Sequence, residues 1–149
     1  MRKAYRILAD IIAIEVVIQA MAIVFSIAGF FKWVDDGHTV DAALLDSDDF
    51  DFPGLVGFIV HGINGQLVIP LLGLVLLIIS FFAKVPGGVK WAAIVFVSII
   101  VQVTAGILAH ETRYMGLVHG LNAFILFSSA IMAARAAAEP AEVTAPAAA

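Results

Sequence analysis

Four long apolar runs divide the chain, at residues 5–31, 53–83, 91–109 and 115–134. Each is close to or above the roughly 20 residues that a helix needs to cross the hydrocarbon core of a bilayer. The first two runs are separated by residues 33–52, a segment with seven aspartates that is too acidic to lie in lipid. Short polar connections join the later runs. The pattern predicts an all-α membrane protein, a bundle of four transmembrane helices with a solvated acidic loop at 33–52.

Composition supports a membrane protein and excludes several other classes. Of the 149 residues, 62% are hydrophobic and only 13% are charged, whereas a soluble domain has about 25% charged residues. The absence of cysteine excludes disulfides, thiolate metal sites, iron–sulfur clusters and c-type haem attachment. No basic surface for nucleic acid is evident.

The positions of the basic residues predict the orientation of the helices in the membrane. Lys32 and Arg113 fall on one side, while six basic residues fall on the other: Arg2, Lys3, Arg6, Lys84, Lys90 and Arg135. Because cytoplasmic loops are enriched in lysine and arginine, we expect both termini in the cytoplasm and the acidic loop outside a bacterial plasma membrane. Residues 1–135 then form the membrane domain, and the Ala/Pro-rich tail at 136–149 is expected to be disordered.

An internal repeat carries the polar residues of the second and fourth runs. Residues 60–64 read VHGIN and residues 118–122 read VHGLN, and a weaker echo places Gln19 and Gln102 in the first and third runs. The chain is therefore interpreted as two similar helical hairpins of the same orientation. Parallel repeats of this kind are related by an axis along the membrane normal.

The repeated histidines predict a haem site. Two neutral imidazoles at similar depth, on symmetry-related helices of a four-helix bundle, suit the two axial positions of a haem iron. His61 and His119 are accordingly the expected ligands of a b-type haem. Gly62 and Gly120 would let the flat haem macrocycle approach the helices. The amides of Asn64 and Asn122 would hydrogen-bond the haem or an imidazole.

Other polar residues in the spans have competing explanations. A histidine or a glutamine in a span is often an interhelical hydrogen-bonding residue without a ligand, and this structural role is the favoured one for Gln19 and Gln102. Glu15 shares a helix face with Gln19 and is expected to be hydrogen-bonded, with Gln102 as a candidate partner. A role of Glu15 in proton uptake or quinone contact is the functional alternative.

The chain resembles one half of haem A synthase, over about the whole membrane portion. The resemblance rests on residues 101–108 (VQVTAGIL) and 117–123 (LVHGLNA), which are similar to that family's Gln, Gly and downstream His. It implies that His61 and His119 are haem ligands. The family's catalytic half carries a Glu before the helix-two His and an Arg after it, whereas this chain has Val60 and Gly62 beside His61. The chain is also similar to small uncharacterised four-helix bacterial membrane proteins.

The sequence thus favours a membrane-embedded b-type haem protein for electron transfer or for haem or redox sensing, and not an enzyme. A membrane subunit or assembly factor without cofactor is the first alternative, and a haem-modifying or haem-handling relative of haem A synthase is the second. Besides the lipid bilayer, the expected partners are a redox protein, subunits of a respiratory complex or a second copy of the chain.

Overall fold

The computed structural model describes residues 1–45, 47 and 50–138, and this part of the chain is helical without strands. The elements, in order, are α1 (Arg2–Asp35), α2 (Ala42–Leu45), α3 (Leu55–Ile63), η1 (Asn64–Val68), α4 (Ile69–Ser80), α5 (Gly88–Leu108) and α6 (Arg113–Ala138). Since α3, η1 and α4 are continuous, the described residues form four helices long and apolar enough to cross a membrane. The prediction of an all-α chain with four helices long and apolar enough to span a membrane is confirmed for these residues.

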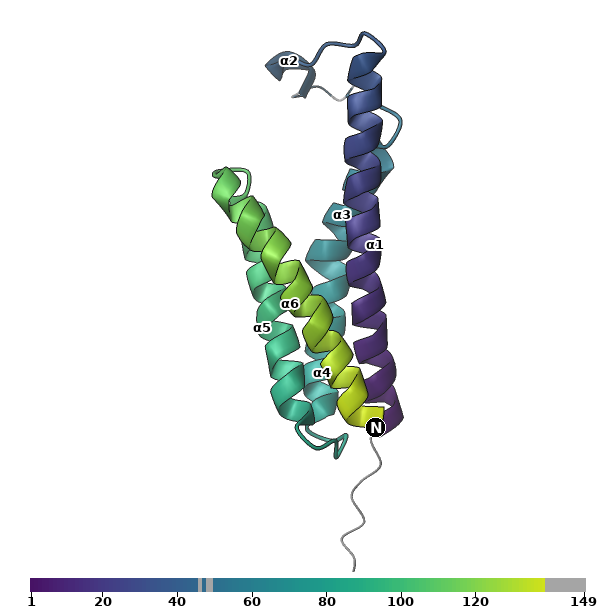
Figure 1. Cartoon of the computed structure of the whole chain (residues 1–149), viewed down its shortest axis with the longest axis vertical. Helices are drawn as coiled ribbons and strands as arrows, with labels where there is room; N and C mark the ends of the chain where they lie inside the picture. The colour runs from purple at the N-terminus through teal and green to yellow at the C-terminus, as the bar shows by residue number, and fades with distance from the viewer. Residues whose placement is uncertain (46, 48–49, 139–149) are drawn as a thin grey trace, which may run out of the picture.

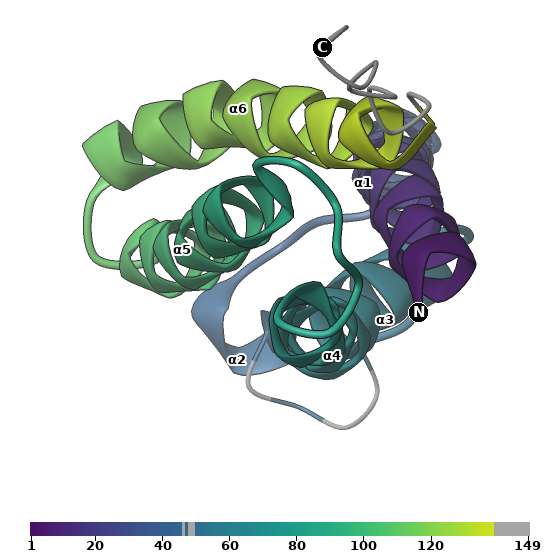
Figure 2. The same cartoon turned by 90° about the horizontal axis from the view of Figure 1, so that it is seen from below.

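The four long helices surround a common centre when viewed along the bundle, with α1 between α6 and the α3 to α4 helix (Figure 2). Helix α5 packs against α4 and α6. At the end that carries the α5 to α6 connection, the α5 and α6 pair leans away from α1 and α3, and α1 rises beyond the tips of both (Figure 1). The bundle is therefore closed at one end and open at the other.

The closed end holds most of the buried core, which is built from small residues. Tyr5, Ile12 and Leu76 are fully buried there among the alanines of α1, α5 and α6. Small residues let membrane helices approach closely, and buried hydroxyls then find backbone partners. The hydroxyl of Tyr5 donates to the carbonyl of Gly88 at 2.8 Å, and Arg2 Nε donates to the carbonyl of Ala137 at 2.9 Å. These contacts fix the closed end, while large apolar side chains on the outside face lipid.

Close backbone contact joins α1 to α3. A Cβ on Gly29 would lie 2.0 Å from the carbonyl oxygen of Pro53, and a Cβ on Gly57 would lie 2.4 Å from that of Ala22. Ser26 Oγ donates to the carbonyl of Gly54 at 2.6 Å. Gly54 itself has φ +124°, a conformation that residues with a side chain rarely adopt. The start of α3 is thus fixed against α1, six residues before His61.

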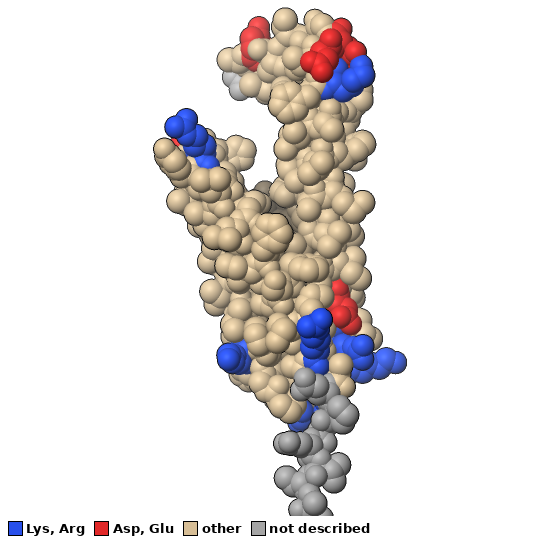
Figure 3. Space-filling view, viewed as in Figure 1, with Lys and Arg blue, Asp and Glu red and all other residues tan. Residues whose placement is uncertain are grey.

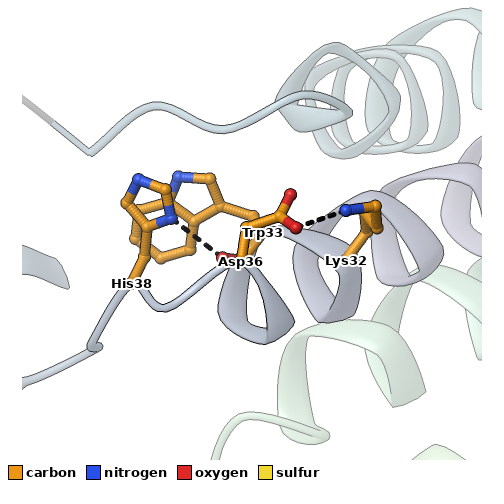
Figure 4. A network of polar contacts seen from close by, with 4 residues as sticks. All are labelled: Lys32, Trp33, Asp36 and His38. Atoms are coloured by element: carbon orange, nitrogen blue, oxygen red, sulfur yellow. Dashed lines mark hydrogen bonds and ion pairs between the residues drawn. The ribbon is translucent and has the colours of Figure 1, made fainter.

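The helix ends differ from the sequence prediction at several points. Helix α1 continues past residue 31 to Asp35, where Lys32 forms an ion pair with Asp36 and the ring of His38 stacks on Trp33 at 4.4 Å (Figure 4). The acidic segment 33–52 contains the short helix α2, which begins after Asp41, whose carboxylate accepts from the N–H of Leu44 at 2.8 Å. The predicted acidic loop thus contains one short helical turn.

The tail prediction needs a similar correction. Helix α6 continues through Ala138, so residues 136–138 are helical because they pack on α1, where Ala137 is buried and accepts from Arg2. Residues 139–149 lie outside the described part of the chain, as do Asp46, Asp48 and Asp49 of the acidic segment.

A π-helical segment, η1, interrupts the second span and begins at Asn64, three residues after His61. The N–H of Ile69 donates to the carbonyl of Asn64, five residues earlier. Pro70 explains the position of this segment, because a proline has no N–H to complete the α-helical bond to Gln66. A π segment adds a residue to one turn and is frequent at functional sites. The sequence analysis treated residues 53–83 as one uniform helix and missed it, although Pro70 was the signal.

Candidate functional site

The structure brings the two repeated histidines together. His61 on α3 and His119 on α6 have ring centroids 6.0 Å apart, with the ring planes at 57°. Both side chains are half-buried. Each lies six residues from the start of its helix, at Leu55 and Arg113 respectively. The two imidazoles therefore face each other at similar depth, near the open end of the bundle.

Each histidine rests on a backbone carbonyl of the neighbouring helix. The Nδ1 atom of His61 lies 3.2 Å from the carbonyl oxygen of Gln19 on α1, and Nδ1 of His119 lies 2.9 Å from that of Gln102 on α5. A carbonyl oxygen only accepts, so a proton on Nδ1 makes each contact a hydrogen bond and leaves a lone pair on Nε2. Metal-bound histidines use this arrangement, in which the second ring nitrogen donates to a carbonyl or a carboxylate.

The amides of the repeat form a polar layer beside each histidine. Asn122 is buried and donates to the carbonyl of Ser98 at 2.8 Å and to Gln102 Oε1 at 2.7 Å. In the other half, Asn64 donates to Glu15 Oε2 at 2.6 Å. Both asparagines thus connect their helix to the preceding span. The expected contact between Glu15 and Gln102 is replaced by the one to Asn64, because Gln102 is bonded to Asn122.

The side chain of Gln19 distinguishes the two halves. In the orientation that satisfies its neighbours, its Oε1 accepts from Asn64 Nδ2 at 2.9 Å, and its Nε2 donates to the carbonyl of His61 at 3.0 Å. The same Nε2 lies 2.8 Å from Nδ1 of His61. His61 Nδ1 therefore faces an acceptor, the carbonyl oxygen of Gln19, and a donor, its Nε2, so His61 has a partner for either tautomer. At His119, Gln102 offers Nδ1 only the acceptor.

The glycines near the histidines have two different surroundings. A Cβ on Gly62 or Gly120 would meet no other atom within 4 Å, so both positions border open space. A Cβ on Gly106 would lie 3.0 Å from Nδ1 of His119. Gly106 therefore lets the His119 ring approach α5. The sequence signal for this contact was the spacing of four residues from Gln102, which places Gly106 on the same face of the helix.

A notch between the two arms of the bundle leads toward this polar layer. In the space-filling view, the α1 arm and the α5 to α6 arm are separated by a V-shaped gap at the open end (Figure 3). No Lys, Arg, Asp or Glu is seen on its visible walls, and such residues gather at the tips of the arms and at the closed end of the bundle.

Asn122 should contribute measurably to stability, and its role can be tested directly. Replacement by leucine removes the donor to Ser98 and Gln102, and we expect a loss of about 1–2 kcal/mol in the free energy of unfolding in detergent. Ser128→Ala, on the exposed side of the same helix, is the matched control and should be neutral. Equal stability of Asn122→Leu and the control would show that the asparagine contributes nothing to helix association.

Four apolar helices that enclose a histidine and amide layer define a multi-pass α-helical membrane protein. No protein-family model, curated protein or solved structure matches the chain.

Proposed function

We propose that the protein binds one b-type haem between His61 and His119. The observation that carries the proposal is the 6.0 Å between the two ring centroids. A metal about 2.0–2.1 Å from a nitrogen of each imidazole, with that nitrogen about 1.1 Å from its ring centroid, requires a separation of about 6.2–6.4 Å. The contacts of Nδ1 with Gln19 and Gln102 leave both Nε2 atoms for such a metal.

The number of protein ligands also favours haem over a simple metal ion. Within the described residues, no group of three or more His, Asp or Glu side chains is placed to hold a metal. A protein zinc site needs three or four ligands from the chain, whereas a haem brings four nitrogens of its own and needs only two. The similarity of residues 101–108 and 117–123 to haem A synthase supports the same assignment.

The chain's own residues would hold and tune the group. His61 and His119 supply the axial nitrogens, while Gln19 and Gln102 fix the ring orientations through their carbonyls. Gly62 and Gly120 leave room beside the rings. A bound haem supplies one-electron chemistry, and two histidine ligands leave no open position for a substrate. The function is therefore electron transfer or redox sensing, with a redox protein, a respiratory complex or a second copy of the chain as partner.

The matching contacts of the two halves support an arrangement as two parallel hairpins. Gln19, His61 and Asn64 in one half correspond to Gln102, His119 and Asn122 in the other. We place both termini in the cytoplasm of a bacterial cell and the acidic segment outside. The basic residues that gather at the closed end support this orientation (Figure 3).

Single cysteines test this orientation cleanly, because the chain has none of its own. In intact spheroplasts, a membrane-impermeant maleimide is expected to label Asp51→Cys and to leave Lys90→Cys unlabelled until the membrane is opened. Both positions are exposed at opposite ends of the bundle, so each variant is the control for the other. Labelling of Lys90→Cys alone in closed cells would reverse the proposed orientation.

Haem binding is tested by purifying the chain in detergent from haem-replete cells and recording its spectrum, air-oxidised and then reduced with dithionite. We expect about one haem per chain and a sharp α band on reduction. A colourless, folded protein would favour the cofactor-free membrane subunit, in which the polar layer only joins helices. Carbon monoxide binding to the reduced protein would reveal an open coordination position and favour the haem-modifying alternative.

A further inference from the structure

Glu15 gives one half of the polar layer an ionisable group that the other half lacks. It lies four residues before Gln19 on α1, and the corresponding residue, four before Gln102 on α5, is Ser98. Asn122 donates to the backbone carbonyl of Ser98, whereas Asn64 donates to the side-chain carboxylate of Glu15. One half of the polar layer thus ends in a group that can bind a proton, and the other half ends in a carbonyl that cannot.

A continuous chain of hydrogen bonds connects this carboxylate to His61. Glu15 Oε2 lies 2.6 Å from Asn64 Nδ2, which in turn lies 2.9 Å from Gln19 Oε1. The Nε2 of the same Gln19 side chain donates to the backbone carbonyl of His61 at 3.0 Å. These bonds lie within helices that are apolar enough to cross a membrane, where polar groups are costly and tend to serve a function.

Few other charges lie near Glu15 to compensate its own. On α1, Asp10 is exposed and pairs with Arg6 at 3.8 Å. The ionisable groups on α3 and α6 are His61, His119 and, toward the two ends of α6, Arg113, Tyr114 and Arg135. Neither η1, α4 nor the part of α5 beyond Lys90 carries an ionisable residue. The polar chain through Asn64 and Gln19 is therefore the connection between Glu15 and His61 that the structure shows.

We propose that Glu15 is the proton-binding site coupled to the redox state of the haem that His61 and His119 would hold. This inference rests on the proposed haem. When the centre gains one electron from a one-electron donor, the Glu15 carboxylate takes up one proton from water, and it releases that proton when the electron leaves. Net charge in the polar layer is then unchanged, which avoids the cost of an uncompensated charge in the membrane. Asn64 positions the carboxylate toward Gln19 and His61.

The test is the pH dependence of the midpoint potential of the haem-loaded protein, measured for the wild type, Glu15→Gln and Asp10→Asn. Uptake of one proton per electron lowers the potential by about 59 mV per pH unit. We expect the wild type and Asp10→Asn to approach this slope over part of the range, and Glu15→Gln to lose it. Redox-difference infrared spectra should show a protonated carboxyl band that forms on reduction and is absent from Glu15→Gln.

The outcomes separate this inference from the proposed function. Both proteins could bind haem and show the same pH dependence of the midpoint potential. That result would assign the proton to another group, such as a haem propionate, and overturn the role of Glu15. A potential that does not vary with pH in the wild type would also overturn it. If the wild type binds no haem, the proposed function fails first and this inference fails with it.

Discussion

Replacement of His119 by alanine is expected to abolish stable haem binding. Loss of a hydrogen-bonding partner of a metal ligand typically costs 10–100-fold in affinity, and loss of the ligand itself should cost more. His119→Ala should lower haem content more than His61→Ala. The reason is that Gln102 offers Nδ1 of His119 only an acceptor, and Gly106 lets the His119 ring lie against α5. His61→Ala should lower haem content as well. The measurement is haem per chain after purification in detergent.

The two histidines outside the polar layer provide matched controls. His38 stacks on Trp33 beyond the spans, and His110 is exposed at the end of α5. We expect His38→Ala and His110→Ala to retain the wild-type haem content. A full complement of haem in both His61→Ala and His119→Ala would exclude the proposed ligands.

The second large effect is expected at Gly57, where α1 and α3 are in closest contact near the site. A Cβ there would lie 2.4 Å from both the carbonyl oxygen of Ala22 and Ser26 Oγ, so Gly57→Ala must push the two helices apart. Overpacking of this kind costs about 1–3 kcal/mol. Since α3 carries His61, the variant should also bind haem more weakly. Thermal unfolding in detergent and haem titration measure the two effects.

Gly116→Ala separates steric overlap from a general effect of replacing a glycine. A Cβ at Gly116 would meet no atom within 4 Å, and its helix would gain from the better propensity of alanine. This variant should be as stable as the wild type or slightly more stable. If Gly57→Ala unfolded at the same temperature as Gly116→Ala, the close packing of α1 on α3 would be disproved.

The spans were predictable from the sequence because hydrophobic length alone determines where a helix can cross a bilayer. The exact ends of the helices were less predictable, since they depend on contacts between distant segments. Helix α1 continues to Asp35 beside the ion pair of Lys32 with Asp36, and α6 continues past residue 135 because Ala137 packs on α1. The length of an apolar run gives no information about the ion pair or about the packing of Ala137.

The part of the candidate site that lies in the internal repeat was predictable from the sequence. The duplicated motif predicted that His61 and His119 lie at similar depth, and in the structure their ring centroids are 6.0 Å apart. Their backbone acceptors were not predictable, because any carbonyl of α1 or α5 could have served. The partner of Glu15 depended in the same way on the packing angle of α1 and α3, which the sequence does not specify.

The most direct test of bis-histidine haem ligation is electron paramagnetic resonance of the oxidised protein, combined with chemical rescue. We expect a low-spin signal in the wild type, a high-spin signal in His61→Gly, and a return to low spin when free imidazole fills the vacated position. A high-spin wild type, or a low-spin signal that persists in His61→Gly without added imidazole, would contradict ligation of the haem by His61 and His119.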